Sequence, residues 1–151
     1  YGVQTPIYFK NASAGYYSDF SDIENCISAV LDKVISSGMI YQVNTLGGKI
    51  TDKEFAAKSA YAHRQYPFLS ELQTYWEKPE QQEKYVNAFR DVQKIFSENN
   101  IRAQYINYPA LEFENYTDAY YGNNYKRLQQ VKLKYDEENI FRHAQSITLP
   151  E

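Results

Sequence analysis

Apolar side chains in the first third of the chain recur three or four residues apart, which predicts one buried helical face over 23–34. Ser21 and Glu24 stand at the spacing of a capping box and predict where this helix begins. Gly38 is well placed to end it, because glycine readily adopts the left-handed conformation that closes a helix. Cys26 lies beside the apolar stripe, so we interpret it as a small buried hydrophobic residue and not as a nucleophile.

Further helices are predicted in the second half of the chain. Pro79 opens one of them, and the apolar stripe of that helix covers 85–96. Two more helices are predicted at 115–121 and 125–135, separated by Gly122. The residues after the last helix are predicted to form an extended tail.

Four segments have the composition or the two-residue alternation of strands. The first is a short run at 7–9, ahead of a loop rich in glycine, serine and asparagine. The others cover 39–46, 68–76 and 101–108. Long helices separate some of these strands, whereas others follow one another directly, which is typical of an α+β fold. We therefore expect a mainly antiparallel sheet with helices packed on one face.

Polar side chains on the predicted strands make up the best candidate site. Neighbouring strands lie about 5 Å apart, so such groups could converge on one patch. Amide side chains donate and accept hydrogen bonds, which suits a hydroxylated ligand. The residues concerned are Gln42, Asn44, Gln73 or Glu71, and Tyr108. The alternative is that this face is simply solvated, as one face of an antiparallel sheet often is.

Composition and charge narrow the class of protein. The 151 residues include 16 tyrosines, and the net charge is -3. The tyrosines are explained either by amphipathic packing or by an aromatic cavity for a ring-shaped ligand. The sequence shows no basic footprint for nucleic acid, no apolar run that would span a membrane, and no metal-ligand spacing. It shows no signal segment either, so the compartment, cytoplasmic or secreted, stays open.

Several motifs occur together in the order and spacing of one enzyme family. The chain resembles the berberine-bridge-enzyme-like FAD-linked oxidases, and its pattern is most similar to their sugar and oligosaccharide oxidases. The last blocks resemble the berberine-like C-terminal module of that family. The blocks that carry the resemblance are Phe9-Lys10 with Ser13, Leu46-Gly-Gly48, His63-Arg64 ahead of Trp76, Tyr105-Ile-Asn-Tyr108, Ala119-Tyr-Tyr-Gly-Asn-Asn-Tyr-Lys-Arg-Leu128, Val131-Lys-Leu-Lys-Tyr-Asp136, Asn139-Ile-Phe141 and Gln145-Ser-Ile147.

The resemblance implies that this chain is the C-terminal part of a two-domain FAD-linked oxidase. Residues 1–103 would be the C-terminal portion of the substrate-binding domain, and 104–151 the berberine-like segment that closes on the FAD domain. The histidine and cysteine that usually attach FAD in this family belong to the missing N-terminal part. We therefore expect FAD to be held mainly by that part, and the isolated chain to be inactive.

The resemblance also implies roles for individual residues. Tyr108 occupies the position of a tyrosine that acts as catalytic base in several members of the family. Gln42 and Gln73 match glutamines that contact the substrate. Asn44 stands where sugar oxidases carry a carboxylate that assists the tyrosine, and Asn107 stands where members approach the flavin.

We therefore expect an FAD-dependent oxidoreductase that oxidises a C–H or alcohol group of a carbohydrate or another polyhydroxylated small molecule. Hydride would pass to the flavin and molecular oxygen would reoxidise it, while the protein positions the substrate and handles its proton. Glu71 is a further candidate for substrate binding and Tyr105 for cofactor binding, and no metal is expected. Two alternatives stay open: a non-catalytic binding or structural module derived from this family, and an independent domain unrelated to flavins.

Overall fold

A three-stranded antiparallel sheet is the centre of the fold. The computed structural model describes residues 7–56 and 58–151. The strands lie in the order β1 (Tyr8–Tyr17), β3 (Phe68–Trp76) and β2 (Ile40–Thr45). The predicted α+β class with an antiparallel sheet is confirmed. Among the helices of the described ranges, none is long and apolar enough to cross a membrane.

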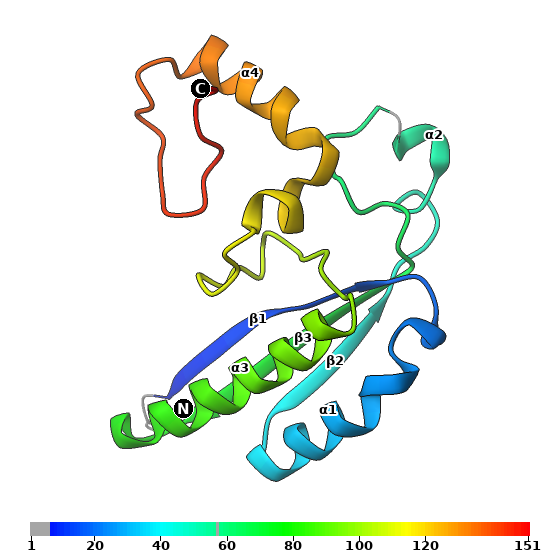
Figure 1. Cartoon of the computed structure of the whole chain (residues 1–151), viewed down its shortest axis with the longest axis vertical. Coiled ribbons are helices and arrows are strands. Elements are labelled where there is room, and N and C mark those ends of the chain that lie inside the picture. The colour runs from blue at the N-terminus through cyan, green and yellow to red at the C-terminus, as the bar shows by residue number, and fades with distance from the viewer. Residues whose placement is uncertain (1–6, 57) are drawn as a thin grey trace, which may run out of the picture.

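Two long helices, α1 (Glu24–Ser37) and α3 (Gln82–Glu98), pack against each other and cover one face of the sheet (Figure 1). α1 ends at Gly38 in the left-handed conformation, with a φ of 67°, as predicted. Cys26 is buried in the core, also as predicted. Each large apolar side chain buried here stabilises the fold by roughly 1.5–3 kcal/mol. The core includes Ala12, Ala14, Val30, Leu72, Phe89, Val92 and Phe96.

The chain beyond α3 leaves this layer and gathers on the far side of β1 (yellow to red in Figure 1). The tail then folds back onto the beginning of α4, where Thr148 hydrogen-bonds to the Tyr125 hydroxyl. The helices predicted in this part of the chain and their separation at Gly122 are present. The remaining elements are the short α2 (Lys53–Ala56), 3-10 turns at Phe20–Asp22, Pro79–Gln81 and Gly122–Asn124, a π-helical turn at Thr117–Tyr121, and α4 (Tyr125–Tyr135).

The capping box lies earlier in the chain than predicted. Asp19 Oδ1 accepts a hydrogen bond from the Ser21 N–H (3.0 Å), and Asp22 Oδ2 accepts one from the Asp19 N–H (3.2 Å). This box opens a 3-10 turn, whereas α1 itself begins at Glu24 with no side-chain cap. Two carboxylates therefore cap the turn in place of the predicted Ser21 and Glu24, and ionised acceptors form the stronger hydrogen bonds.

A ten-residue strand replaces the loop predicted after 7–9. Ala12 and Ala14 enter the core with 0% and 2% exposure, while Asn11 and Ser13 alternate with them on the opposite face. Small side chains let the strand lie close beneath α3. The prediction failed because alanine, serine and asparagine lack the β-branched and aromatic composition that normally indicates a strand.

The fourth predicted strand, 101–108, is not a strand. The segment runs along the outer edge of β1 but makes only isolated backbone bonds to it. The Tyr16 N–H donates to the Ala103 carbonyl (3.0 Å), and the Ser13 N–H donates to the Tyr108 carbonyl (2.9 Å). The register of β1 shifts between these two contacts, so a continuous ladder is interrupted. The described sheet therefore has three strands and not four.

Candidate active site on the open face of the sheet

The sheet register brings polar side chains of all three strands onto the face opposite α1 and α3. Residues paired across antiparallel strands share a face. Glu71 of β3 is paired with Ser13 of β1 and with Gln42 of β2, and Gln73 is paired with Asn11. We call this surface the open face. It carries the predicted residues Gln42, Asn44, Glu71 and Gln73.

Glu71 lies at the centre of the open face and is only 3% exposed. Its Oε1 accepts hydrogen bonds from Asn11 Nδ2 (2.6 Å) and from Gln73 Nε2 (2.7 Å). The oxygen of the Gln73 amide accepts a further bond from the Tyr75 hydroxyl (2.9 Å). A buried carboxylate is costly unless hydrogen bonds compensate for lost water, and the two amides provide such bonds. Their arrangement fixes both the position and the orientation of the carboxylate.

Gln42 and Asn44 lie beside Glu71 on the neighbouring strand. Gln42 Nε2 donates to Asn44 Oδ1 (3.0 Å), so the two amides orient each other. Gln42 is exposed and Asn44 half-buried, which leaves this pair accessible to a ligand on the open face. The structure thus places both predicted amides together, next to the buried carboxylate.

Tyr108 is brought to the open face by a turn that is fastened to Ser13. The Tyr108 N–H donates to the Tyr105 carbonyl (3.0 Å) and closes the turn. The Ser13 N–H binds the Tyr108 carbonyl (2.9 Å), and Ser13 Oγ accepts from the Tyr105 N–H (3.0 Å). Because Ser13 is paired with Glu71 in the sheet, the turn lies next to that carboxylate. Burial, followed by the charge and hydrogen bonding of Glu71, raises the pKa of Tyr108.

Asn107 and Tyr105 form a polar pair on the outside of the same turn. Asn107 is exposed, and its Nδ2 donates to Tyr105 Oη (2.8 Å). The Tyr105 ring meets the Tyr108 ring edge-on, with the centroids 5.1 Å apart. An amide and a phenol at the rim of the site fit the polar edge of a flavin ring, so both residues remain suitable for the cofactor contact predicted for them.

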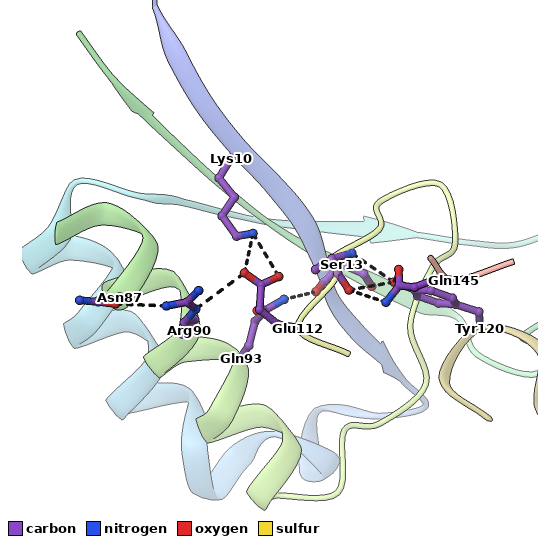
Figure 2. Close-up of polar contacts among 9 residues, drawn as sticks. Lys10, Ser13, Asn87, Arg90, Gln93, Glu112, Tyr120 and Gln145 are labelled. Atoms are coloured by element: carbon purple, nitrogen blue, oxygen red, sulfur yellow. Dashed lines mark hydrogen bonds and ion pairs between the residues drawn. The ribbon is translucent and has the colours of Figure 1, made fainter. Parts of the chain in front are cut away.

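The residues that follow the Tyr105–Tyr108 turn are also anchored to the rest of the fold (Figure 2). Lys10 Nζ binds both oxygens of Glu112 (3.0 and 3.3 Å), and Arg90 Nε lies 3.7 Å from the same carboxylate. Although burial opposes the change, bonds from its own backbone N–H and from Lys10 lower the pKa of the Glu112 carboxyl. Gln145 Nε2 donates to the Ala110 carbonyl (2.8 Å), which ties the C-terminal tail to this segment. The position of Tyr108 is therefore fixed by contacts on both sides.

An aromatic cluster continues the open face beyond the Glu71 patch. Tyr16 is in contact with the rings of Tyr61, His63, Tyr66 and Tyr105, and its hydroxyl is hydrogen-bonded to that of Tyr61. Burial is the main cause that raises the pKa of Tyr16, and burial lowers the pKa of His63. The His63 side chain is therefore neutral at ordinary pH and packs as an aromatic ring in this cluster. The tyrosines of this cluster pack against one another.

Two hollows in the part of the chain that the structure describes are lined by residues other than Glu71 and Tyr108. One, of about 1080 Å³, is bounded by 61–66, α3 and 112–124. The other, of about 650 Å³, lies between α4 and the C-terminal tail. Among the described residues, no group of three or more histidine, cysteine or acidic side chains is placed to hold a metal ion.

Two residues of the patch were missed by sequence reasoning. Asn11 and Ser13 fall in the segment predicted to be a loop, yet Asn11 holds Glu71 and Ser13 holds the Tyr108 turn. The strict alternation of Asn11, Ala12, Ser13 and Ala14 is the signal that could have found them. Two small residues in the core and two polar residues on the other face are compatible with a strand.

Comparison with known proteins identifies the family that this chain resembles. The sequence model for the family described as "Berberine and berberine like" matches residues 104–148. A carbohydrate oxidase of Microdochium nivale is 32% identical over 130 residues, which cover 78% of this chain and 26% of that protein. The uncharacterised FAD-linked oxidoreductase YgaK of Bacillus subtilis is 33% identical over 90 residues, which cover 60% of this chain and 20% of that protein.

Solved structures show the same fold. BBE-like 1 of Physcomitrella patens has a TM-score of 0.79 at 21% identity, over 95% of this chain and 31% of that one. The glycopeptide hexose oxidase DBV29, solved with teicoplanin, has a TM-score of 0.74 at 24% identity, over 96% of this chain and 32% of that one. The present chain has the fold of the berberine-bridge-enzyme-like FAD oxidases and carries a berberine-like segment, as the sequence motifs predicted. It spans about a fifth to a quarter of the length of these two curated relatives.

Proposed function

We propose that this chain forms part of the substrate site of an FAD-dependent oxidoreductase that oxidises a C–H or alcohol group of a carbohydrate or another polyhydroxylated small molecule. The observation that carries the proposal is the convergence of Gln42, Asn44 and Gln73 with Tyr108 and Glu71 on one sheet face. The similarity to a carbohydrate oxidase supports the substrate class. FAD, when bound, supplies the hydride acceptor, and molecular oxygen then serves as the final oxidant.

The amide side chains suit the recognition of hydroxyl groups. Each amide has a donor and an acceptor end, and can therefore bind a hydroxyl in either role. Gln42 and Asn44 are mutually bonded through one donor and one acceptor, and Gln73 is directed by Glu71 and Tyr75. Such pre-oriented groups lower the cost of ordering the site when a flexible sugar binds.

Tyr108 is proposed as the catalytic residue that receives the hydroxyl proton of the substrate. Two hydrogen bonds join its turn to Ser13 and fix the backbone from which the Tyr108 side chain extends. A positioned proton acceptor typically contributes 10²–10⁴-fold to the rate. Asn107 and Tyr105, on the outer side of the turn, are proposed to face the flavin.

The rest of the enzyme is proposed to be an N-terminal FAD domain that precedes this chain. Residues 1–103 would belong to the substrate domain, and 104–151 would return to the FAD domain. Tyr135, Ile140 and Phe141 are 74%, 69% and 79% exposed, which suits a contact with another domain. Such a domain would also cover the polar face, on which Gln42 is exposed.

A direct test is to express the complete open reading frame and the 151-residue chain side by side. We expect the complete protein to be yellow and to reduce oxygen in the presence of a panel of mono- and oligosaccharides. We expect the chain alone to elute colourless from gel filtration after incubation with FAD. A complete protein that binds flavin but oxidises none of the hydroxylated compounds would contradict the proposed substrate class.

A second candidate function is a non-catalytic binding module. Asn44 is uncharged where the sugar oxidases carry an assisting carboxylate, and the pKa of Tyr108 is raised by burial and by Glu71, which opposes formation of a phenolate. A complete protein that is colourless and still binds oligosaccharides would favour this function over the first.

A further inference from the structure

The β-bulge of β1 lies beside the turn that carries Tyr108. On one edge of a regular strand, the outward-pointing N–H groups recur at every second residue. On β1 the two N–H groups that bind the 101–108 segment are three residues apart. Ser13 N–H donates to the Tyr108 carbonyl (2.9 Å), and Tyr16 N–H donates to the Ala103 carbonyl (3.0 Å). The bulge produces this spacing, because the register of β1 shifts between Ser13 and Gly15.

The hydroxyl oxygen of Ser13 joins the bulge to the turn. Ser13 Oγ accepts a hydrogen bond from the Gly15 N–H (3.2 Å), the local bond that serine side chains form with the backbone two residues later. The same oxygen accepts a second bond from the Tyr105 N–H (3.0 Å), at a sequence separation of 92 residues. Ser13 is 0% exposed, so water does not compete for either bond. One buried oxygen therefore connects β1 with the beginning of the Tyr105–Tyr108 turn.

The turn that Ser13 binds carries residues for both sides of the proposed reaction. Tyr108 is the proposed proton acceptor, whereas Tyr105 and Asn107 are proposed to face the flavin. Ser13 binds the N–H at the beginning of the turn and the carbonyl at its end. The turn is also closed internally by the bond from the Tyr108 N–H to the Tyr105 carbonyl. The backbone of the turn is thus held as one unit against β1.

We propose that Ser13 is a positioning residue of the active site, and that the bulge it closes sets where the Tyr105–Tyr108 turn lies between substrate and flavin. The inference rests on the proposed function. Ser13 acts through the backbone of the turn and not by contact with the reacting atoms. Displacement of a reacting group by about 1 Å can lower a rate about 100-fold, so the loss of one anchoring bond is large enough to measure.

Ser70 provides a matched control for Ser13. Both serines are 0% exposed, and both bind the backbone of Gly15. Ser13 Oγ accepts from the Gly15 N–H, and Ser70 Oγ donates to the Gly15 carbonyl (3.0 Å). The difference between them is the Tyr105 N–H, which Ser13 binds. Substitution of either serine by alanine removes one buried hydroxyl from the same bulge, so a general loss of stability should be similar in the two variants.

The first test needs no turnover. Hydrogen exchange of the complete protein is followed by mass spectrometry in peptides that cover 101–110. In Ser13→Ala we expect the Tyr105 amide to exchange at least about 10-fold faster than in the wild type, because its buried acceptor is gone. Ser70→Ala is expected to leave the exchange of these peptides unchanged. Wild-type exchange of these peptides in Ser13→Ala would overturn the anchoring role.

The second test separates positioning from general stability. In Ser13→Ala we expect the limiting rate of anaerobic flavin reduction by a sugar to fall about 10–100-fold, with little change in the sugar concentration for half-saturation. Ser70→Ala is expected to keep the wild-type limiting rate, although urea unfolds both variants more easily than the wild type. Equal limiting rates in the two variants would overturn the inference. If Ser13→Ala does not fold, Ser13→Cys offers a weaker acceptor of similar size, and a wild-type limiting rate in that variant would overturn the inference as well.

The outcomes also distinguish this inference from the proposed function. A wild-type protein that oxidises sugars, together with an unimpaired Ser13→Ala, would leave the proposed function intact and remove the positioning role of Ser13. A wild-type protein that reduces no flavin with any sugar would overturn both.

Discussion

Two buried polar side chains, Glu71 and Gln145, each hold several other groups of this chain in place. Glu71 accepts hydrogen bonds from the amides of Asn11 and Gln73, and Gln145 ties the C-terminal tail to the Ala110 carbonyl, two residues after Tyr108. Gln145 is 6% exposed, donates to the Ala110 and Phe113 carbonyls, and accepts from the Tyr120 hydroxyl. Removal of either side chain would leave buried groups without a partner, which costs more than the bonds themselves contribute.

Gln145→Leu is therefore expected to lower the free energy of unfolding by about 1–3 kcal/mol, because it leaves buried carbonyl and hydroxyl groups unpaired. Urea unfolding of the protein measures the change. Gln82→Leu is a matched control, since Gln82 is exposed at the beginning of α3, and it should alter stability by less than about 0.5 kcal/mol. Equal effects of the two substitutions would contradict the role given to Gln145.

At the level of elements, helices and central strands could be predicted from the sequence, whereas the path of the chain around β1 could not. The apolar stripe of α3 and the alternation in β3 are local patterns that packing preserves. The alanines of β1 are too small to produce such a pattern. The 101–108 segment has the composition of a strand, but its backbone bonds go partly to Ala119 and to its own turn. Tertiary contacts decide that geometry.

Gly15 lies at the register shift of β1, with a φ of +107° that side chains rarely tolerate. An added Cβ would collide with the Ile101 side chain, in the segment that leads to Tyr108. Gly15→Ala is expected to cost about 1–3 kcal/mol of stability, mainly from backbone strain. Gly47→Ala, with open space around it, is the control for urea unfolding and should be close to neutral. A Gly15→Ala protein as stable as the Gly47→Ala protein would contradict this account of the bulge.

On the scale of the whole molecule, the candidate site is a sheet face that the proposed FAD domain would cover. Sequence reasoning placed Gln42, Asn44 and Gln73 correctly on one face, because the two-residue alternation of a strand fixes direction. It could not find Asn11 or the position of the Tyr108 turn beside Glu71, because these depend on which strands are neighbours. The assignment of roles to these residues stays a prediction. The chain covers about a third of the length of the two solved structures compared above, and the proposed FAD domain would complete the site.

The most direct test of the central claim is the anaerobic rate of flavin reduction by a sugar substrate in the complete protein, measured for the wild type and for Tyr108→Phe. The variant keeps the ring and its packing but lacks the hydroxyl that takes the proton. We predict that the rate falls at least about 100-fold while the flavin absorbance of the oxidised protein is unchanged. A Tyr108→Phe enzyme whose flavin is reduced as fast as that of the wild type would contradict the proposed role of this site.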